Sequence, residues 1–173
     1  MSGARWWVRI LRRLGIAVLV FAAFIAYLAW RDYRSAATEL DKYAIGDCLV
    51  LAQDGIGVKD AAAECDTDPS YLVASRIGGD DTCPNEHYTA FEVTAGGSSG
   101  GKLCLVENLV PGHCYETEMI SKVTKLVDCS RGSMFTPMYR VVTRHDTGDA
   151  ACPDGQTVIA YPEPGPGRTY CMA

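Results

Sequence analysis

Eight cysteines are the residues with the clearest chemistry in this chain of 173 residues. Cysteine can form disulfides, bind zinc or exchange thiols, and spacing separates these roles. Zinc sites and thioredoxin-like sites need close pairs such as C-x-x-C, whereas the nearest cysteines here, Cys104 and Cys114, are ten residues apart. We therefore predict a disulfide framework in an oxidising compartment, with no metal and no cofactor. Its members are Cys48, Cys65, Cys83, Cys104, Cys114, Cys129, Cys152 and Cys171.

A serine motif and three histidines are the other candidates for catalysis. The run from Gly96 to Gly101 satisfies G-x-S-x-G at Ser98 and at Ser99. A nucleophile elbow needs a strand before it, a helix after it and a large α/β sheet, so we interpret the run as a flexible loop. The histidines are isolated: His87, His113 and His145. We predict a protein without catalytic residues, and a redox or hydrolytic enzyme is the weaker alternative.

Acidic residues gather before two of the cysteines. Asp80 and Asp81 precede Cys83, and Asp146 and Asp149 precede Cys152. Neither group has the regular oxygen spacing of a calcium loop. We interpret both as solvated turns, with a weak calcium site as the alternative.

The N-terminal region has the pattern of a membrane anchor. Residues 1–13 hold four arginines and no acid, and the next seventeen residues, 14–30, run from Leu14 to Trp30 without a charge. This length just crosses a bilayer as a helix, and the arginines predict a cytoplasmic N-terminus. A cleaved signal peptide is the alternative, although seventeen residues exceed the usual apolar region of such peptides. In both cases the rest of the chain is exported.

Residues 31–45 predict a helical stalk, because they lack Gly and Pro and are rich in helix formers. Gly46 is a candidate stop for this helix. We expect a spacer, or alternatively a stripe that docks on a neighbouring membrane helix. Residues 31–173 carry 12 basic and 21 acidic side chains, which argues against a nucleic-acid partner.

The exported part repeats itself: residues 46–106 align with residues 112–173. Gly46-Asp47-Cys48 matches Gly112-His113-Cys114, and the segment from Ser70 to Arg76 matches the segment from Met138 to Arg144. The pairs Cys83-Pro84 and Cys152-Pro153 follow at similar intervals, as do Cys104-Leu105 and Cys171-Met172. We therefore predict two tandem disulfide-linked units.

Each unit reads as short strands between Gly and Pro turns. In the first unit we expect strands over residues 48–51, 58–65, 71–77, 89–93 and 102–106. The predicted fold class is mainly β, with antiparallel sheets in two similar lobes and a small α+β fold as the variant. Bridges kept within a repeat allow nine pairings. We prefer Cys48–Cys65, Cys83–Cys104, Cys114–Cys129 and Cys152–Cys171, from sequential proximity and equivalent use in both copies.

The order of these anchors resembles the exported domains of actinobacterial LppU-type lipoproteins and the related septum-formation domains. The resemblance is carried by Gly46-Asp47-Cys48, Cys65, Tyr71, Val73, Cys83-Pro84 and Cys104-Leu105, and by the second copy more loosely. It implies a small cystine-linked module of the cell envelope, in a group without an assigned activity or catalytic residues. This chain lacks the lipidated cysteine of the lipoproteins.

We therefore expect a single-pass, membrane-anchored scaffold or accessory subunit in the plasma membrane that binds an envelope or membrane protein. Tyr71 and Arg76, with their counterparts Tyr139 and Arg144, are candidates for a binding surface. Packing of the tyrosines and pairing of the arginines with the acidic loops is the alternative. A site for a small ligand or wall polymer in the cleft between the lobes is the second functional hypothesis.

Overall fold

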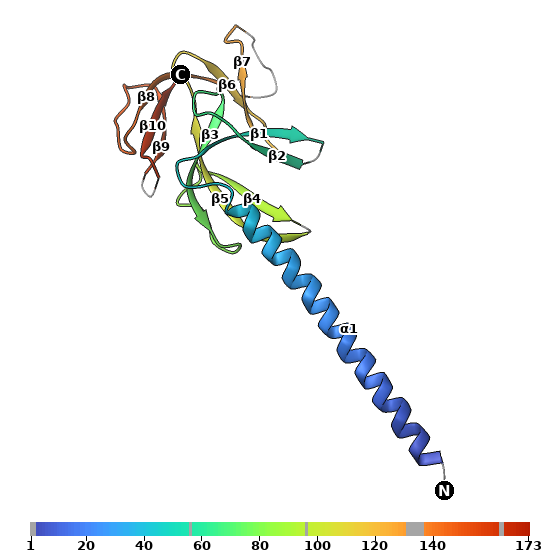
Figure 1. The fold of residues 1–173 in the computed structure, drawn as a ribbon. Coiled ribbons are helices and arrows are strands. Elements are labelled where there is room, and N and C mark those ends of the chain that lie inside the picture. Colours follow the sequence, from blue (N-terminus) through green and yellow to red (C-terminus); the bar gives the residue numbers. More distant parts are fainter. Residues whose placement is uncertain (1–2, 56, 96, 131–136, 163–164) are drawn as a thin grey trace.

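The computed structural model describes residues 3–55, 57–95, 97–130, 137–162 and 165–173. One long helix precedes two β-sheet units, and the helix projects from the body (Figure 1). The elements in chain order are α1 Gly3–Leu40, β1 Cys48–Asp54, β2 Gly57–Ala62, β3 Ser70–Ile77, β4 Thr89–Ala95, β5 Ser98–Asn108, β6 Cys114–Thr117, β7 Thr124–Val127, β8 Met138–His145, β9 Thr157–Tyr161 and β10 Arg168–Met172.

The two units have the same topology, which confirms the mainly β fold with two antiparallel units. The strand order is β2-β1-β3-β5-β4 in the first sheet and β7-β6-β8-β10-β9 in the second. Each strand of one order has its counterpart at the same place in the other. The duplication seen in the sequence is therefore a duplication of structure.

The equivalence extends to single hydrogen bonds. The amide of Gly46 donates to the carbonyl of Val73 at 2.8 Å, and the amide of Gly112 donates to the carbonyl of Val141 at 2.7 Å. Both glycines have positive φ, 96° and 91°, a conformation that glycine adopts without a steric penalty. The Gly-x-Cys anchors thus mark the same turn into the first strand of each unit.

All eight cysteines form disulfides in the preferred pairing. Each bridge closes a loop within one unit, and the pairs are Cys48–Cys65, Cys83–Cys104, Cys114–Cys129 and Cys152–Cys171. Bridges over loops of 15 to 21 residues stabilise a small unit mainly by restricting its unfolded chain.

The alternation of side chains along β5 builds two hydrophobic cores. Leu103 and Leu105 face a core formed largely by the first unit, together with Tyr43. Cys104 and Val106 face the opposite side, where they pack in a core that includes residues of both units. The second unit contributes five buried side chains to this shared core: Tyr115, Val141, Tyr161, Tyr170 and Met172. The two units therefore pack as one body.

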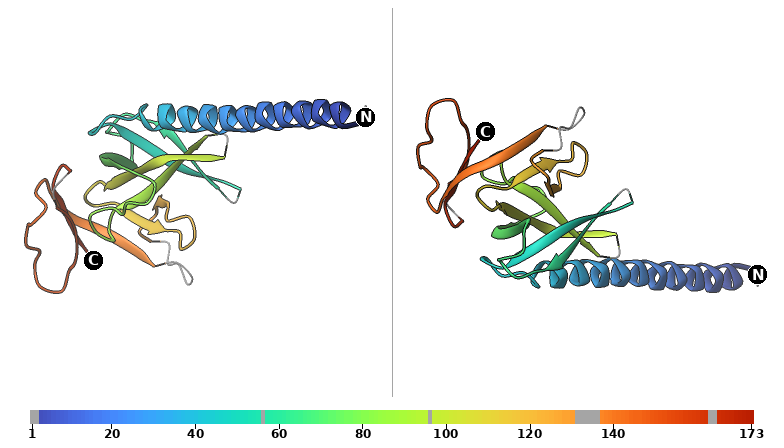
Figure 2. Two further views of the ribbon diagram at one scale, coloured as in Figure 1. Left: turned by 90° about the horizontal axis from the view of Figure 1, so that it is seen from below. Right: turned by 90° about the horizontal axis from the view of Figure 1, so that it is seen from above.

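The C-terminal part of α1 packs against the first unit. Ala36 is fully buried, and Gly100 of β5 lies so close that a Cβ there would be 2.2 Å from the carbonyl oxygen of Ala36. Figure 2 shows α1 alongside the β4–β5 hairpin, with the first unit between the helix and the second unit. The end of α1, with Ala36 and Leu40, thus contacts the body itself.

Three expectations about local structure are wrong. The helix ends at Leu40, not at residue 45, because the chain must turn to bury Tyr43 in the first core. Gly46 lies in the turn before β1 and does not end the helix. The Gly/Ser run is not a loop throughout: Ser98 and Ser99 begin strand β5, which pairs with β4.

Candidate functional site

A cavity of about 590 Å³ lies between the two units. Its first wall comes from β1, β2 and β4, and includes Leu51, Val58 and Phe91. The second wall comes from the second unit and includes Tyr139, Ile159 and Tyr161. This volume lies within the range of small-molecule sites, which are concave and mainly apolar with a few polar groups. We call this cavity the inter-unit cleft.

Glu107 lines the cleft near the end of β5. It follows Leu103 and Leu105 on the same face of the strand, where an apolar residue would continue the pattern. Its residue surface is 7% exposed. The carboxylate accepts hydrogen bonds from the hydroxyl of Thr124 and from the hydroxyl of Tyr161, the latter at 3.3 Å. The cleft thus contains a buried carboxyl group held by two neutral donors.

Burial raises the pKa of Glu107, and the hydrogen bonds from Thr124 and Tyr161 oppose the rise in part. The same environment acts on the neighbouring phenols. Burial, and secondly the charge of Glu107, raise the pKa of Tyr71 to about 12 and also raise the pKa of Tyr139. The directions agree, because a low-polarity site disfavours every anion placed in it.

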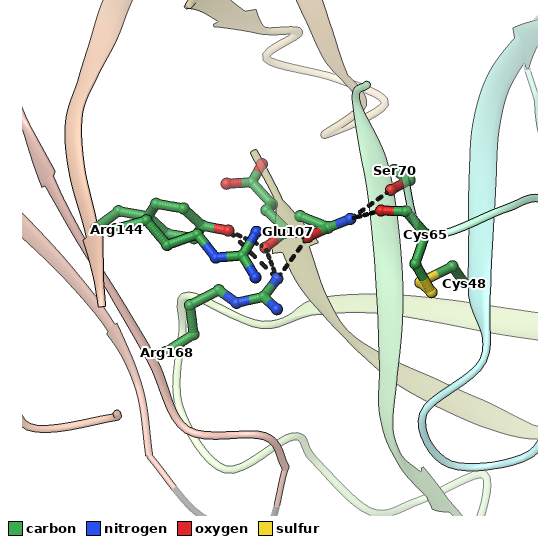
Figure 3. The surroundings of a disulfide bond; sticks show 8 residues. Cys48, Cys65, Ser70, Glu107, Arg144 and Arg168 are labelled. Carbon is green, nitrogen blue, oxygen red and sulfur yellow. Dashed lines mark hydrogen bonds between the residues drawn. A yellow bond between two sulfur atoms is a disulfide. The ribbon is translucent and has the colours of Figure 1, made fainter. Parts of the chain in front are cut away.

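Two arginines lie near Glu107 but bind other groups. Nη1 of Arg168 donates to the backbone carbonyl of Glu107 at 3.3 Å and to Oδ1 of Asn108 at 2.8 Å. Nη1 of Arg144 donates to the same Oδ1 at 3.1 Å. In Figure 3 the carboxylate of Glu107 points away from both guanidinium groups. Within the described residues, no lysine, arginine or histidine forms an ion pair with Glu107.

Asn108 joins the first disulfide to the second unit. Its amide nitrogen donates to the carbonyl of Cys65 at 2.6 Å and to the hydroxyl of Ser70 at 2.9 Å, while its oxygen accepts from both arginines. This side chain is buried and uses donors and acceptors on both sides of the interface. The network fixes the end of β5, and therefore the position of Glu107.

Aromatic rings line the cleft beside Glu107. Tyr161 packs edge-to-face with Tyr88, with ring centroids 5.3 Å apart, and lies 6.5 Å from the ring of His87. Tyr88 donates its hydroxyl hydrogen bond to the carbonyl of Pro162. His87, Glu86 and Lys122 are exposed where they line the cleft. The cleft therefore has an apolar and aromatic interior and a charged rim.

The four residues expected to form a binding surface are not brought together. Tyr139 lines the cleft, whereas Tyr71 is buried in the first core, and its hydroxyl oxygen accepts from the amide of Thr124 at 2.8 Å. Arg76 pairs with Asp41, just after α1, at 3.0 Å. Arg144 pairs with Asp146 at 3.0 Å, so the expected pairing with an acidic loop occurs in the second unit alone.

His113 takes part in a second polar contact between the two units. Its Nδ1 lies 2.6 Å from Oδ2 of Asp68, and Tyr115 donates to the other oxygen of this carboxylate at 2.6 Å. Asp68 belongs to the first unit, so this cluster is a second polar link across the interface. Among the described residues, no three His, Cys, Asp or Glu side chains are grouped in a way that could hold a metal ion.

Sequence reasoning missed Glu107 and Tyr161. Glu107 lies one residue beyond the expected first unit, so the alignment of the two copies did not include it. One signal was present: an acidic residue in the apolar strand pattern of residues 103–107. A comparison of the chain with family models, with curated proteins and with solved structures finds no match.

Proposed function

We propose that this protein is a single-pass, membrane-anchored binding protein of the cell envelope that takes a small ligand in the inter-unit cleft. The observation that carries the proposal is the cleft itself, with a buried carboxyl group and aromatic rings at the junction of two duplicated units. If the two units only stabilised each other, a fully packed apolar interface would be more stable, because a buried charged group and an unfilled volume both cost stability.

The membrane location rests on α1 and on the disulfides. The segment from Arg12 to Leu40 is the one described helix long and apolar enough to cross a membrane, and an 18-residue window within it has a mean hydropathy of 2.0. The disulfides suit a body outside the cytoplasm, and the arginines before the span suit an N-terminus inside it. The resemblance to LppU-type domains supports the same location. Labelling of Lys59 in intact cells with a membrane-impermeant amine reagent tests this orientation.

Ligand binding is tested with the full chain in lipid nanodiscs, incubated with a small-molecule extract of the native cells. Mass spectrometry then identifies the compounds that stay bound after washing. Ala90 lines the cleft and is exposed, so Ala90→Trp should fill the cleft without disturbing the core. Ala61→Trp is the matched control, because Ala61 is also an exposed alanine on a strand. We expect compounds that the wild type and Ala61→Trp retain and Ala90→Trp loses. Equal retention by all three proteins contradicts the proposal.

A protein-binding role is the second candidate, and the turn between β6 and β7 favours it. Ile120 is 98% exposed and Met119 is 73% exposed on this turn. Adjacent exposed apolar side chains suit a contact with another protein. A photo-cross-linker at Ile120 should give one discrete adduct in native membranes. A cross-linker at Val158, which is 45% exposed, is the control, and the same adducts from both positions would contradict the role.

A further inference from the structure

We infer that the ligand of the inter-unit cleft is a small organic ammonium compound, with Glu107 as its counter-ion and with Tyr139 and Tyr161 beside its cationic group. This inference rests on the proposed function, since it names the class of ligand for the same cleft. It is carried by three features of the cleft: the carboxyl group without a paired cation, the aromatic lining, and the lack, among the described residues, of a group of three His, Cys, Asp or Glu side chains that could hold a metal ion.

The charge of the cleft points to a cation. Glu107 is buried, both of its side-chain partners are neutral hydroxyls, and within the described residues no cation pairs with it. A buried carboxylate is stable when a positive charge lies against it, and a ligand can supply that charge where the protein does not. An anionic ligand would place two negative charges in one low-polarity site.

The charged groups on the rim do not reverse this preference. Glu86 adds a second acid, and Lys122 is exposed at the opposite rim on a turn with φ 57°. Lys122 lies next to Ser121 and Val123, at the β6–β7 turn, and its charge remains solvated.

The lining favours an organic cation over a metal ion. Aromatic rings attract ammonium groups through their π faces, and Tyr139 and Tyr161 both line the cleft near Glu107. Hard metal ions take six or more oxygen ligands, with carboxylates prominent among them, whereas no three His, Cys, Asp or Glu side chains are grouped to hold a metal ion in the described part of the chain. The apolar side chains of Leu51, Phe91 and Ile159 suit the hydrocarbon part of an amine.

The experiment compares amines with neutral counterparts of nearly the same shape, on the full chain in nanodiscs. The probes are tyramine against 4-propylphenol, choline against 3,3-dimethylbutanol, and glucosamine against glucose, measured by saturation-transfer NMR and by calorimetry. We expect at least one amine to bind with a Kd below about 1 mM, and its neutral counterpart to bind about tenfold more weakly or not at all. Equal affinity within every pair, or no binding by any amine, overturns the inference.

Two variants assign the effect to Glu107. Glu107→Gln keeps the shape of the side chain and removes its charge, so the affinity for the amine should fall about tenfold or more. Lys122→Met removes a rim cation, so the affinity should stay the same or rise. Unchanged affinity in Glu107→Gln overturns the inference. The comparison of amines with neutral probes uses the wild type alone, so it decides the question even if Glu107→Gln does not fold.

The proposed function and this inference fail differently. If the wild type retains a neutral or anionic compound that Ala90→Trp loses, the cleft is a ligand site and the ammonium inference is wrong. If the cleft-filling variant and the wild type retain the same compounds, the proposed function is wrong as well.

Discussion

Gly100 should be essential for the contact between the membrane helix and the body. A Cβ on this residue would lie 2.2 Å from the carbonyl oxygen of Ala36 and 2.4 Å from its carbonyl carbon. Ordinary contacts begin at 3.4 Å, so α1 and β5 would have to separate by more than 1 Å. Backbone atoms on both sides cannot give way as a flexible side chain would. Overpacking of this kind costs ~1–3 kcal/mol.

Hydrogen exchange followed by mass spectrometry measures the loss of local stability in the segments that make this contact. In Gly100→Ala, in nanodiscs, peptides covering residues 36–43 and 98–103 should exchange ~5- to 150-fold faster, because local opening becomes easier by the same free energy. Gly79→Ala is the control: it is not in the left-handed region, and its nearest atom is the hydroxyl oxygen of Ser99 at 3.9 Å. Unchanged exchange in Gly100→Ala would refute the close approach of helix and strand.

Three further predictions concern stability. Burial raises the pKa of Glu107 in the folded protein above its value in the unfolded chain. At a pH between these two values, the folded protein holds a proton on Glu107 and the unfolded chain does not. Stability therefore falls by up to ~1.4 kcal/mol per pH unit as pH rises through that interval, and a pH series of unfolding curves should show a shallower fall in Glu107→Gln. Replacing both Cys83 and Cys104 by Ser should cost ~3 kcal/mol in denaturant unfolding without reducing agent, and equal stability would refute the structural role of the bridge. Tyr170 donates to the carbonyl of Glu107 at 2.8 Å and accepts from the amide of Leu109 at 3.0 Å, so Tyr170→Phe should cost ~1–3 kcal/mol, a loss that an unfolding midpoint equal to that of the wild type would contradict.

The features predicted well from the sequence are those that local chemistry determines. The duplication was visible in anchor residues such as Gly46 and Gly112, which both have positive φ and lie at the same turn of each unit. The disulfide pairing follows from order, since each bridge joins neighbours within one copy. Such signals are repeated, and each copy supports the interpretation of the other.

The features that were missed depend on contacts between distant segments. Glu107 becomes a candidate site residue once Thr124 and Tyr161 are known to surround it, and these lie 17 and 54 residues away. The end of the helix at Leu40 also depends on tertiary contacts. Tyr43 lies beyond the helix, where it packs in the first core and donates to Asp60 at 2.6 Å. Helix propensity alone favoured a longer helix.

Strand β5 joins the contact with α1 to the inter-unit cleft. Gly100 at its beginning contacts α1, and Glu107 near its end lines the cleft. Seven residues of extended strand separate them by roughly 20 Å. The β4–β5 hairpin points along α1 toward its N-terminus, so β5 runs from the side of the apolar segment toward the second unit (Figure 1). If α1 is anchored as we propose, the cleft is held at a fixed distance outside the bilayer, and its ligand arrives from the aqueous envelope rather than from the lipid. A water-soluble ammonium compound fits that route.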